Sequence, residues 1–288
     1  MAVTPDFLLT KIPIGKWVQW LVDFLTNHFD VQFRLFSNGL EQIIQAVLHL
    51  IGLIPPLVLI GAVGCAGYLL HRRWKTALGV SLALLLILNL GYWQQTIETV
   101  GLVLFSTFIC VIVGVPIGIM AAHRRWLFTI IRPILDLMQT IPTFVYLIPT
   151  LMLFGLGMVP GLISTVIFAI PAPIRLTYLG ITGVPRELSD AGKAFGASRL
   201  QLLLKVELPH AMPTIMAGLT QCIMLSLSMV VIAALVGADG LGKPVVRALN
   251  TVNIAQGFEA GLAIVIVAIV LDRLLKKPPA AKRGLTSK

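Results

Sequence analysis

A succession of long apolar runs constrains the fold of this chain more than any other feature. Several runs approach or exceed the roughly 18–20 residues that an α-helix needs to cross a lipid bilayer. Of the 288 residues, 57% are hydrophobic and 12% are charged, and the mean hydropathy is +0.94. This composition is far from that of an ordinary soluble domain. The sequence therefore predicts an all-α, polytopic membrane protein.

About seven transmembrane helices are predicted within the segment 41–275. Their expected positions are 48–70, 76–93, 97–121, 134–155, 160–181, 212–236 and 258–275. Ahead of them, residues 14–29 place Trp17 and Phe24 with other apolar side chains at helical spacing, opposite a polar face. This pattern predicts an amphipathic helix within the N-terminal segment 1–40. Such a helix either lies in the membrane interface or packs against the rest of the protein.

Lysine and arginine are concentrated on one side of this topology. Seventeen of the 22 fall in the connections 71–75, 123–125 and 185–213, in the basic tail 276–288, or at helix ends beside them. Cytoplasmic connections carry an excess of these residues, so we expect the N-terminus outside and the C-terminus in the cytoplasm. The same rule accounts for the net charge of +10 without a nucleic-acid partner.

Prolines and glycines are spread unevenly through the predicted spans. A bend is expected at Pro55–Pro56, and the prolines at 142, 149, 171 and 173 interrupt the fourth and fifth spans. Pro116 lies between Gly114 and Gly118, a small-xxx-small face that lets two helices approach closely. Interrupted backbone is tolerated in a membrane where it is buried in protein or lines a water-filled cavity.

These interruptions favour a translocation path along the third to sixth spans, with simple packing kinks as the alternative. Aromatic rings can hold a ligand cation by cation–π attraction, although aromatic side chains also pack in cores. The candidate path residues are Gln139, Pro142, Phe144, Tyr146, Pro149, Phe168, Pro171, Met224 and Ser228, with Phe154 and Tyr178 as further aromatic candidates.

The sequence predicts no catalytic centre, no bound cofactor and no metal site. Histidines and cysteines lack ligand spacing. Gly237–Lys243 matches G-x4-G-K, but Pro244 follows where a P-loop has Ser or Thr, and no strand is expected before it. Ionisable residues are expected near span ends, where Arg132 and Asp136 form an i,i+4 pair. A proton- or sodium-coupled carrier would need charges deeper in the membrane.

A polar, basic island, residues 185–213, separates two of the apolar segments. Pro185 suits the first position of a short helix, and Gly196 suits its left-handed C-cap. Ser198 and Gln201 form a capping box that restarts a helix, which Pro209 is expected to limit. The pattern predicts two short cytoplasmic helices joined by a glycine turn.

This island resembles the EAA loop of ABC importer permeases, a pattern written E-A-A-x3-G-x9-I-x-L-P. The matching positions are Asp190, Ala191, Gly192, Gly196, Val206, Leu208 and Pro209, with Asp190 in place of glutamate, Gly192 in place of the second alanine and Val206 in place of isoleucine. The flanking segments 136–149, 166–177, 208–242 and 263–273 are similar to the glycine betaine/proline betaine/choline branch of that family.

The resemblance implies the type I permease fold of a bacterial inner-membrane ABC importer. It implies a homodimer with two copies of an ATPase subunit, which bind the ATP, and a periplasmic or tethered substrate-binding protein. The cargo would be glycine betaine, proline betaine, choline or carnitine. The residues expected to contact and couple to the ATPase are Glu187, Asp190, Ala191, Gly192, Lys193, Gly196, Ala197, Ser198, Val206, Leu208 and Pro209.

Two other functions remain open from the sequence. An ABC permease of this kind could carry amino acids or another small polar solute. A channel or secondary carrier that works alone is the second alternative, and the island 185–213 argues against it because such a protein needs no ATPase-docking loop.

Overall fold

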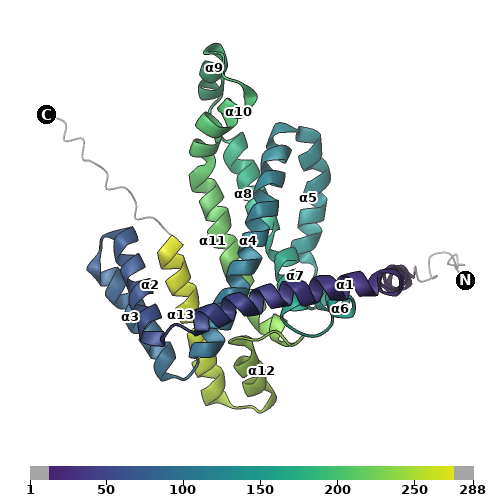
Figure 1. The fold of residues 1–288 in the computed structure, drawn as a ribbon. Helices are drawn as coiled ribbons and strands as arrows, with labels where there is room; N and C mark the ends of the chain where they lie inside the picture. Colours follow the sequence, from purple (N-terminus) through teal and green to yellow (C-terminus); the bar gives the residue numbers. More distant parts are fainter. Residues whose placement is uncertain (1–12, 276–288) are drawn as a thin grey trace, which may run out of the picture.

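A computed structural model describes residues 13–275, and the regular structure in this region is helical (Figure 1). The predicted tail 276–288 and the first twelve residues of the segment 1–40 lie outside the described residues. In order, the helices are α1 (Ile14–Gly52), α2 (Pro56–His71), α3 (Trp74–Asn89), α4 (Trp93–His123), α5 (Arg125–Thr140), α6 (Thr143–Phe154), α7 (Met158–Ala169), α8 (Pro171–Thr182), α9 (Arg186–Ala194), α10 (Arg199–Leu202), the π-helical turn η2 (Leu203–Glu207), α11 (Leu208–Ala234), α12 (Gly242–Asn250) and α13 (Ile254–Leu275).

Each predicted span corresponds to a helix or a helix pair. Four segments are long and apolar enough to cross a membrane unaided: 93–123, 158–182, 199–234 and 254–275. Two further pairs, α1 with α2 and α5 with α6, bend by 94° and 96° and raise the number to six. The remaining predicted span is α3, which is apolar but only 16 residues long. The prediction of an all-α polytopic fold is confirmed.

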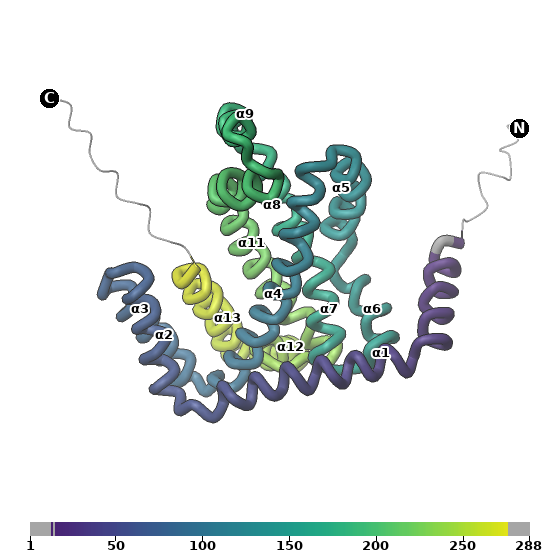
Figure 2. Tube along the Cα trace, turned by 45° about the horizontal axis from the view of Figure 1, so that its top comes forward, coloured from purple at the N-terminus to yellow at the C-terminus, as the bar shows by residue number. Residues whose placement is uncertain are grey.

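Helix α1 is much longer than the amphipathic stretch 14–29. It continues for 39 residues, through residue 40, and runs across one end of the bundle (Figure 2). Its early residue Trp20 is exposed, whereas Phe33 makes an edge-to-face contact with Phe154 of α6 at 5.3 Å between ring centroids. The Ser37 hydroxyl also donates to the Phe154 carbonyl oxygen. The later half of α1 therefore packs on the protein, while its first turns present apolar side chains outward.

The fourth predicted span is broken instead of continuous. It begins earlier than expected, at Arg125, and bends by 96° between α5 and α6. Pro142 is the N-cap of α6, and its predecessor Ile141 is extended, because a residue before proline is disfavoured in the helical conformation. The Tyr146 hydroxyl donates to the Met138 carbonyl oxygen at 2.7 Å, which satisfies one acceptor freed by the break.

Other prolines disturb their helices less. Pro171 is the first residue of α8 and leaves α7 and α8 as one candidate span. Pro149 lies inside α6 and Pro116 inside α4. The predicted bend at residues 55–56 is confirmed by the 94° angle between α1 and α2.

Helices α4 and α8 approach each other closely at the centre of the bundle. A methyl group built on Gly118 would lie 2.6 Å from the Thr177 Cβ, and one on Gly114 would lie 3.1 Å from the Pro173 ring. The predicted small-residue face on α4 is therefore a helix contact. On another side of α4, the Ser106 hydroxyl donates to the Ser226 hydroxyl of α11 at 3.1 Å.

The basic connections point toward one end of the molecule. In Figure 2 α9 and the α4–α5 turn lie at the top and α1 and α12 at the bottom, while the α2–α3 turn and the C-terminal end of α13 point upward at intermediate height. The charge asymmetry of the sequence thus becomes an asymmetry in space, as a protein oriented by the positive-inside rule requires.

Candidate functional site

The polar island forms a short helical hairpin at the basic end of the bundle, with α9 at its tip (Figure 1). Pro185 caps α9, one position earlier than predicted. Gly196 has φ +76°, and its N–H bonds to the Lys193 carbonyl while the Ala197 N–H bonds to the Gly192 carbonyl. This is the Schellman pattern of a helix C-terminus, so the predicted glycine cap is confirmed.

The second half of the hairpin starts at the predicted capping box. The Ser198 N–H donates to the Gln201 side chain at 2.8 Å, and the Gln201 N–H donates back to the Ser198 hydroxyl. The expectation that Pro209 limits the helix is wrong, because α10, η2 and α11 form one candidate span from residue 199 to 234. In η2 the Leu208 N–H bonds five residues back, to Leu203, and this wider turn accommodates the proline that follows.

The hairpin is exposed on one side and packed on the other. Gly192 lets α9 lie against the second half, since a methyl group there would be 2.8 Å from the Leu202 side chain. The remaining predicted coupling residues sort into two groups: Glu187, Asp190, Ala191, Lys193, Gly196, Ser198 and Pro209 are exposed, whereas Ala197, Val206 and Leu208 are partly buried. Asp190 and Lys193 form a solvent-exposed ion pair at 3.2 Å.

The most exposed large side chain of the hairpin was missed by the sequence analysis. Phe195, directly before the glycine turn, is 92% exposed. Leu200 and Leu204 are exposed on the second half of the hairpin. The sequence did contain a signal for this residue, because Phe195 is the only Phe, Tyr or Trp between residues 185 and 213. An isolated exposed aromatic on a polar projection is typical of a protein-contact anchor.

A second contact joins the base of the hairpin to α4. Glu207, in η2, is buried, and its Oε2 lies 2.9 Å from the His123 Nε2. The other ring nitrogen of His123 lies 2.9 Å from the Ile119 carbonyl oxygen. Both ring nitrogens of His123 therefore lie 2.9 Å from an oxygen atom, and the ring links η2 to α4. The contact is chiefly electrostatic, since Glu207 Oε2 has no aligned hydrogen-bond donor among residues 13–275.

We expect Glu207→Gln and His123→Gln each to destabilise the protein by about 1–3 kcal/mol, the cost of leaving a buried or half-buried charge unpaired. The double variant should be no less stable than either single variant, because the second change removes the charge that the first left unpaired. Thermal unfolding in detergent measures all four proteins. Additive losses in the double variant would contradict a direct pair.

The predicted path residues do not form one aromatic cage. Tyr146 binds the α5 backbone, Phe154 packs on α1, and Tyr178 stacks on Phe128 with ring centroids 3.6 Å apart. The other candidates are distributed over α5 to α8 and α11: Phe144, Pro142 and Ser228 are exposed, Gln139, Pro149, Phe168 and Met224 are partly buried, and Pro171 is buried.

An ion pair between α5 and α8 replaces the predicted local one. Asp136 does not pair with Arg132; its Oδ1 accepts a hydrogen bond from the Arg175 Nη2 at 2.5 Å. Asp136 lies about 16 Å along α5 from Arg125, within the last two turns of the helix. The predicted i,i+4 pair with Arg132 is therefore wrong, because α8 brings Arg175 to Asp136.

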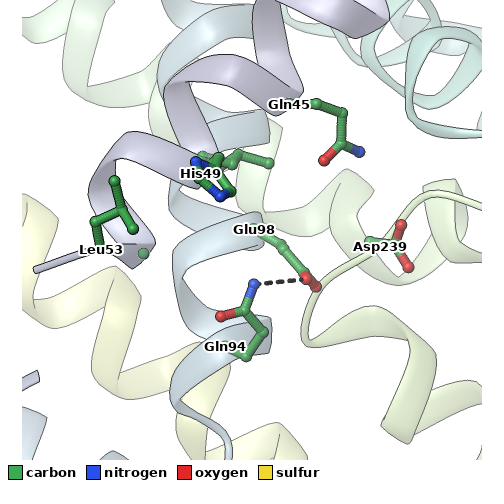
Figure 3. Close-up of a pocket in the computed structure, with 8 residues that line it drawn as sticks. Gln45, His49, Leu53, Gln94, Glu98 and Asp239 are labelled. Carbon is green, nitrogen blue, oxygen red and sulfur yellow. Dashed lines mark hydrogen bonds between the residues drawn. The ribbon is translucent and has the colours of Figure 1, made fainter. Parts of the chain in front are cut away.

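A polar cavity of about 320 Å³ lies at the opposite end, between α1, α4 and the turn before α12 (Figure 3). Gln94 donates to Glu98 at 3.2 Å, and Asp239 faces them across the cavity. Asp239 also pairs with Lys243. The segment Gly237–Lys243 follows helix α11, and positive φ angles at Gly237 and Gly240 make it the predicted turn.

The helical bundle and its projecting polar hairpin define a polytopic membrane protein. A family model for the inner membrane component of binding-protein-dependent transport systems matches residues 114–275. The chain belongs to this family.

Individual relatives cover nearly the whole chain. It is 45% identical over 276 residues to the glycine betaine transport system permease protein OpuAB of Bacillus subtilis, covering 96% of this chain and 98% of that protein. It is also 45% identical to the glycine betaine/carnitine transport permease protein GbuB of Listeria monocytogenes, covering 92% and 95%. Identity to the Escherichia coli glycine betaine/proline betaine permease ProW is 42%, covering 94% and 77%.

Solved structures agree on the fold. The inward-facing MetNI methionine ABC transporter matches 62% of this chain and 91% of its own chain with a TM-score of 0.56 and 23% identity. This likeness supports the type I permease fold and nothing about cargo.

Proposed function

We propose that the chain is the membrane subunit of an ATP-driven importer for quaternary ammonium osmolytes such as glycine betaine, proline betaine, choline and carnitine. The hairpin 185–208 is the observation that carries the proposal. It is a polar helical projection with one exposed aromatic residue, Phe195. Relatives whose names include these solutes support the choice of cargo.

In this proposal a homodimer encloses the path, and one ATPase subunit binds the hairpin of each protomer. The ATPase subunits bind and hydrolyse ATP, and a periplasmic or tethered binding protein delivers the solute at the opposite end. The basic end of the bundle, with the C-terminus of the chain, faces the cytoplasm, and the N-terminus lies outside. This orientation follows the distribution of lysine and arginine.

Uptake of labelled glycine betaine and choline in cells with and without this chain tests the proposal. The proposal expects uptake that requires the chain, the ATPase and ATP. Competition by proline, carnitine and amino acids separates an osmolyte importer from a permease for another small polar solute. Transport down a gradient by the purified chain alone in liposomes would favour a channel or carrier.

We expect Phe195→Ala to reduce the amount of ATPase that co-purifies with the chain at least tenfold. Exposed aromatic anchors at protein interfaces typically contribute about 2 kcal/mol or more, which corresponds to a larger factor than ten. The matched control is Phe258→Ala, because Phe258 is 71% exposed at the start of α13, at the other end of the molecule. Equal co-purification by both variants would remove Phe195 from the interface.

A further inference from the structure

The Asp136–Arg175 ion pair is unusual in being both deep and accessible. Asp136 belongs to a candidate membrane-crossing pair of helices, and Arg175 lies seven residues, or about 10 Å, before the end of the span 158–182. The side chains nevertheless remain 53% and 35% exposed in the protomer. Charged groups at membrane depth do not face lipid without a large free-energy cost, so they face water or protein.

Polar side chains on the neighbouring helix share this property. Gln221 and Ser228 of α11 are seven residues apart, and both are exposed although they lie inside the span 199–234. Residues seven apart lie on the same face of a helix. Helix α11 packs along α8, where Gly218 contacts Leu176, next to Arg175. The exposed polar groups of α5, α8 and α11 are therefore best accounted for by a water-filled path.

We propose that Asp136 and Arg175 form a binding site for zwitterions in this path. Arg175 would take the carboxylate of the solute, for which a planar guanidinium offers two parallel donors. Asp136 would take the quaternary ammonium group, which has no hydrogen-bond donor and is attracted by charge alone. The inference rests on the proposed function and extends it to the solute class that the path prefers.

The charge balance explains why this site suits a zwitterion. A bound zwitterion replaces one internal ion pair by two ion pairs with the solute, and the internal pair forms again when the solute leaves. A cation alone would leave Arg175 unpaired at membrane depth, and an anion would leave Asp136 unpaired, which is costly in each case. Without solute, Asp136 and Arg175 neutralise each other. Solute binding therefore exchanges the internal ion pair for pairs with the solute, and this exchange allows the solute to be released.

The test uses the complete assembly, with wild-type binding protein and ATPase, and compares uptake of glycine betaine with uptake of choline, which lacks the carboxylate. Arg175→Gln should lower glycine betaine uptake at least tenfold and shift the uptake ratio toward choline. Asp136→Asn should lower glycine betaine uptake by a similar factor. Because each single variant leaves one charge unpaired, uptake is expressed per assembled complex, and the thermal unfolding midpoint is measured beside it.

The matched control is the exposed Asp30–Arg34 pair of α1, whose atoms lie 2.8 Å apart. Asp30→Asn and Arg34→Gln should transport like the wild type. Wild-type uptake by Asp136→Asn or Arg175→Gln, or an equal loss of both solutes in Arg175→Gln, would overturn the zwitterion site and leave the proposed function standing. Absence of glycine betaine uptake by the wild-type assembly would overturn the proposed function, and this inference with it.

Discussion

Replacing Gly196 by valine should lower osmolyte uptake at least tenfold while the protein still inserts into the membrane. Gly196 closes the Schellman turn of the hairpin with φ +76°. A β-branched residue in this left-handed region costs about 2–3 kcal/mol, the upper part of the range for a strained backbone, so the population of the observed turn falls by a factor of ten or more. The hairpin would keep its polar surface but lose the fixed angle between α9 and α10, through which an ATPase would act.

Asparagine at the same position is the matched control. Nothing lies within 4 Å of a Cβ built on Gly196, so a side chain there meets open space and the effect of a substitution is conformational. Asparagine tolerates the left-handed region better than other residues with a side chain, and Gly196→Asn should retain most of the uptake. Uptake and membrane content are measured together for both variants. Normal uptake by Gly196→Val would contradict a coupling role for this turn.

Gly118→Leu should prevent most of the protein from folding, for a different reason. Its Cβ would lie 2.6 Å from the Thr177 Cβ and 2.7 Å from the Ile174 carbonyl oxygen. Neither neighbour can move aside by a side-chain rotation, because the carbonyl oxygen belongs to the backbone and the Thr177 Cβ is bonded directly to it. Helices α4 and α8 would have to separate, and overpacking of this kind costs about 3 kcal/mol. Such a loss is a large part of the stability of a typical domain.

Gly79→Leu in α3 makes the same substitution where there is room. No atom lies within 4 Å of a Cβ built on Gly79, so an apolar side chain added there has room on the exposed face of α3. The yield of monodisperse protein in detergent and its unfolding midpoint should match the wild type for Gly79→Leu and fall sharply for Gly118→Leu. Similar behaviour of the two variants would show that the α4–α8 contact is looser than the structure indicates.

Features that depend on neighbours along the chain were predictable. The lengths of the apolar runs indicated the membrane helices, and Gly196 and Ser198 marked the turn and the helix start of the hairpin. Gly114 and Gly118 marked a close helix contact, though not its partner α8. These features follow from backbone sterics, local hydrogen bonds and the thickness of a bilayer.

Features that depend on distant residues were not predictable in the same way. Local spacing suggested Arg132 as the partner of Asp136, but α8 brings Arg175 within 2.5 Å from 39 positions away. Because proline lacks a backbone N–H, the sequence indicated that the helix would end near Pro209. The π-helical turn before Pro209 instead lets the helix continue. In both cases an alternative that is available only in the folded protein is more favourable than the local one.

By itself, the sequence determined the class of fold, the basic end of the bundle and the local shape of the hairpin, because each depends on hydropathy, net charge or a few consecutive residues. Only the tertiary structure decided which charges meet between α5 and α8, that the hairpin exposes its Phe195 side chain, and how α1 lies across the bundle. Those properties depend on how helices from different parts of the chain pack together, and no short stretch of residues specifies that packing.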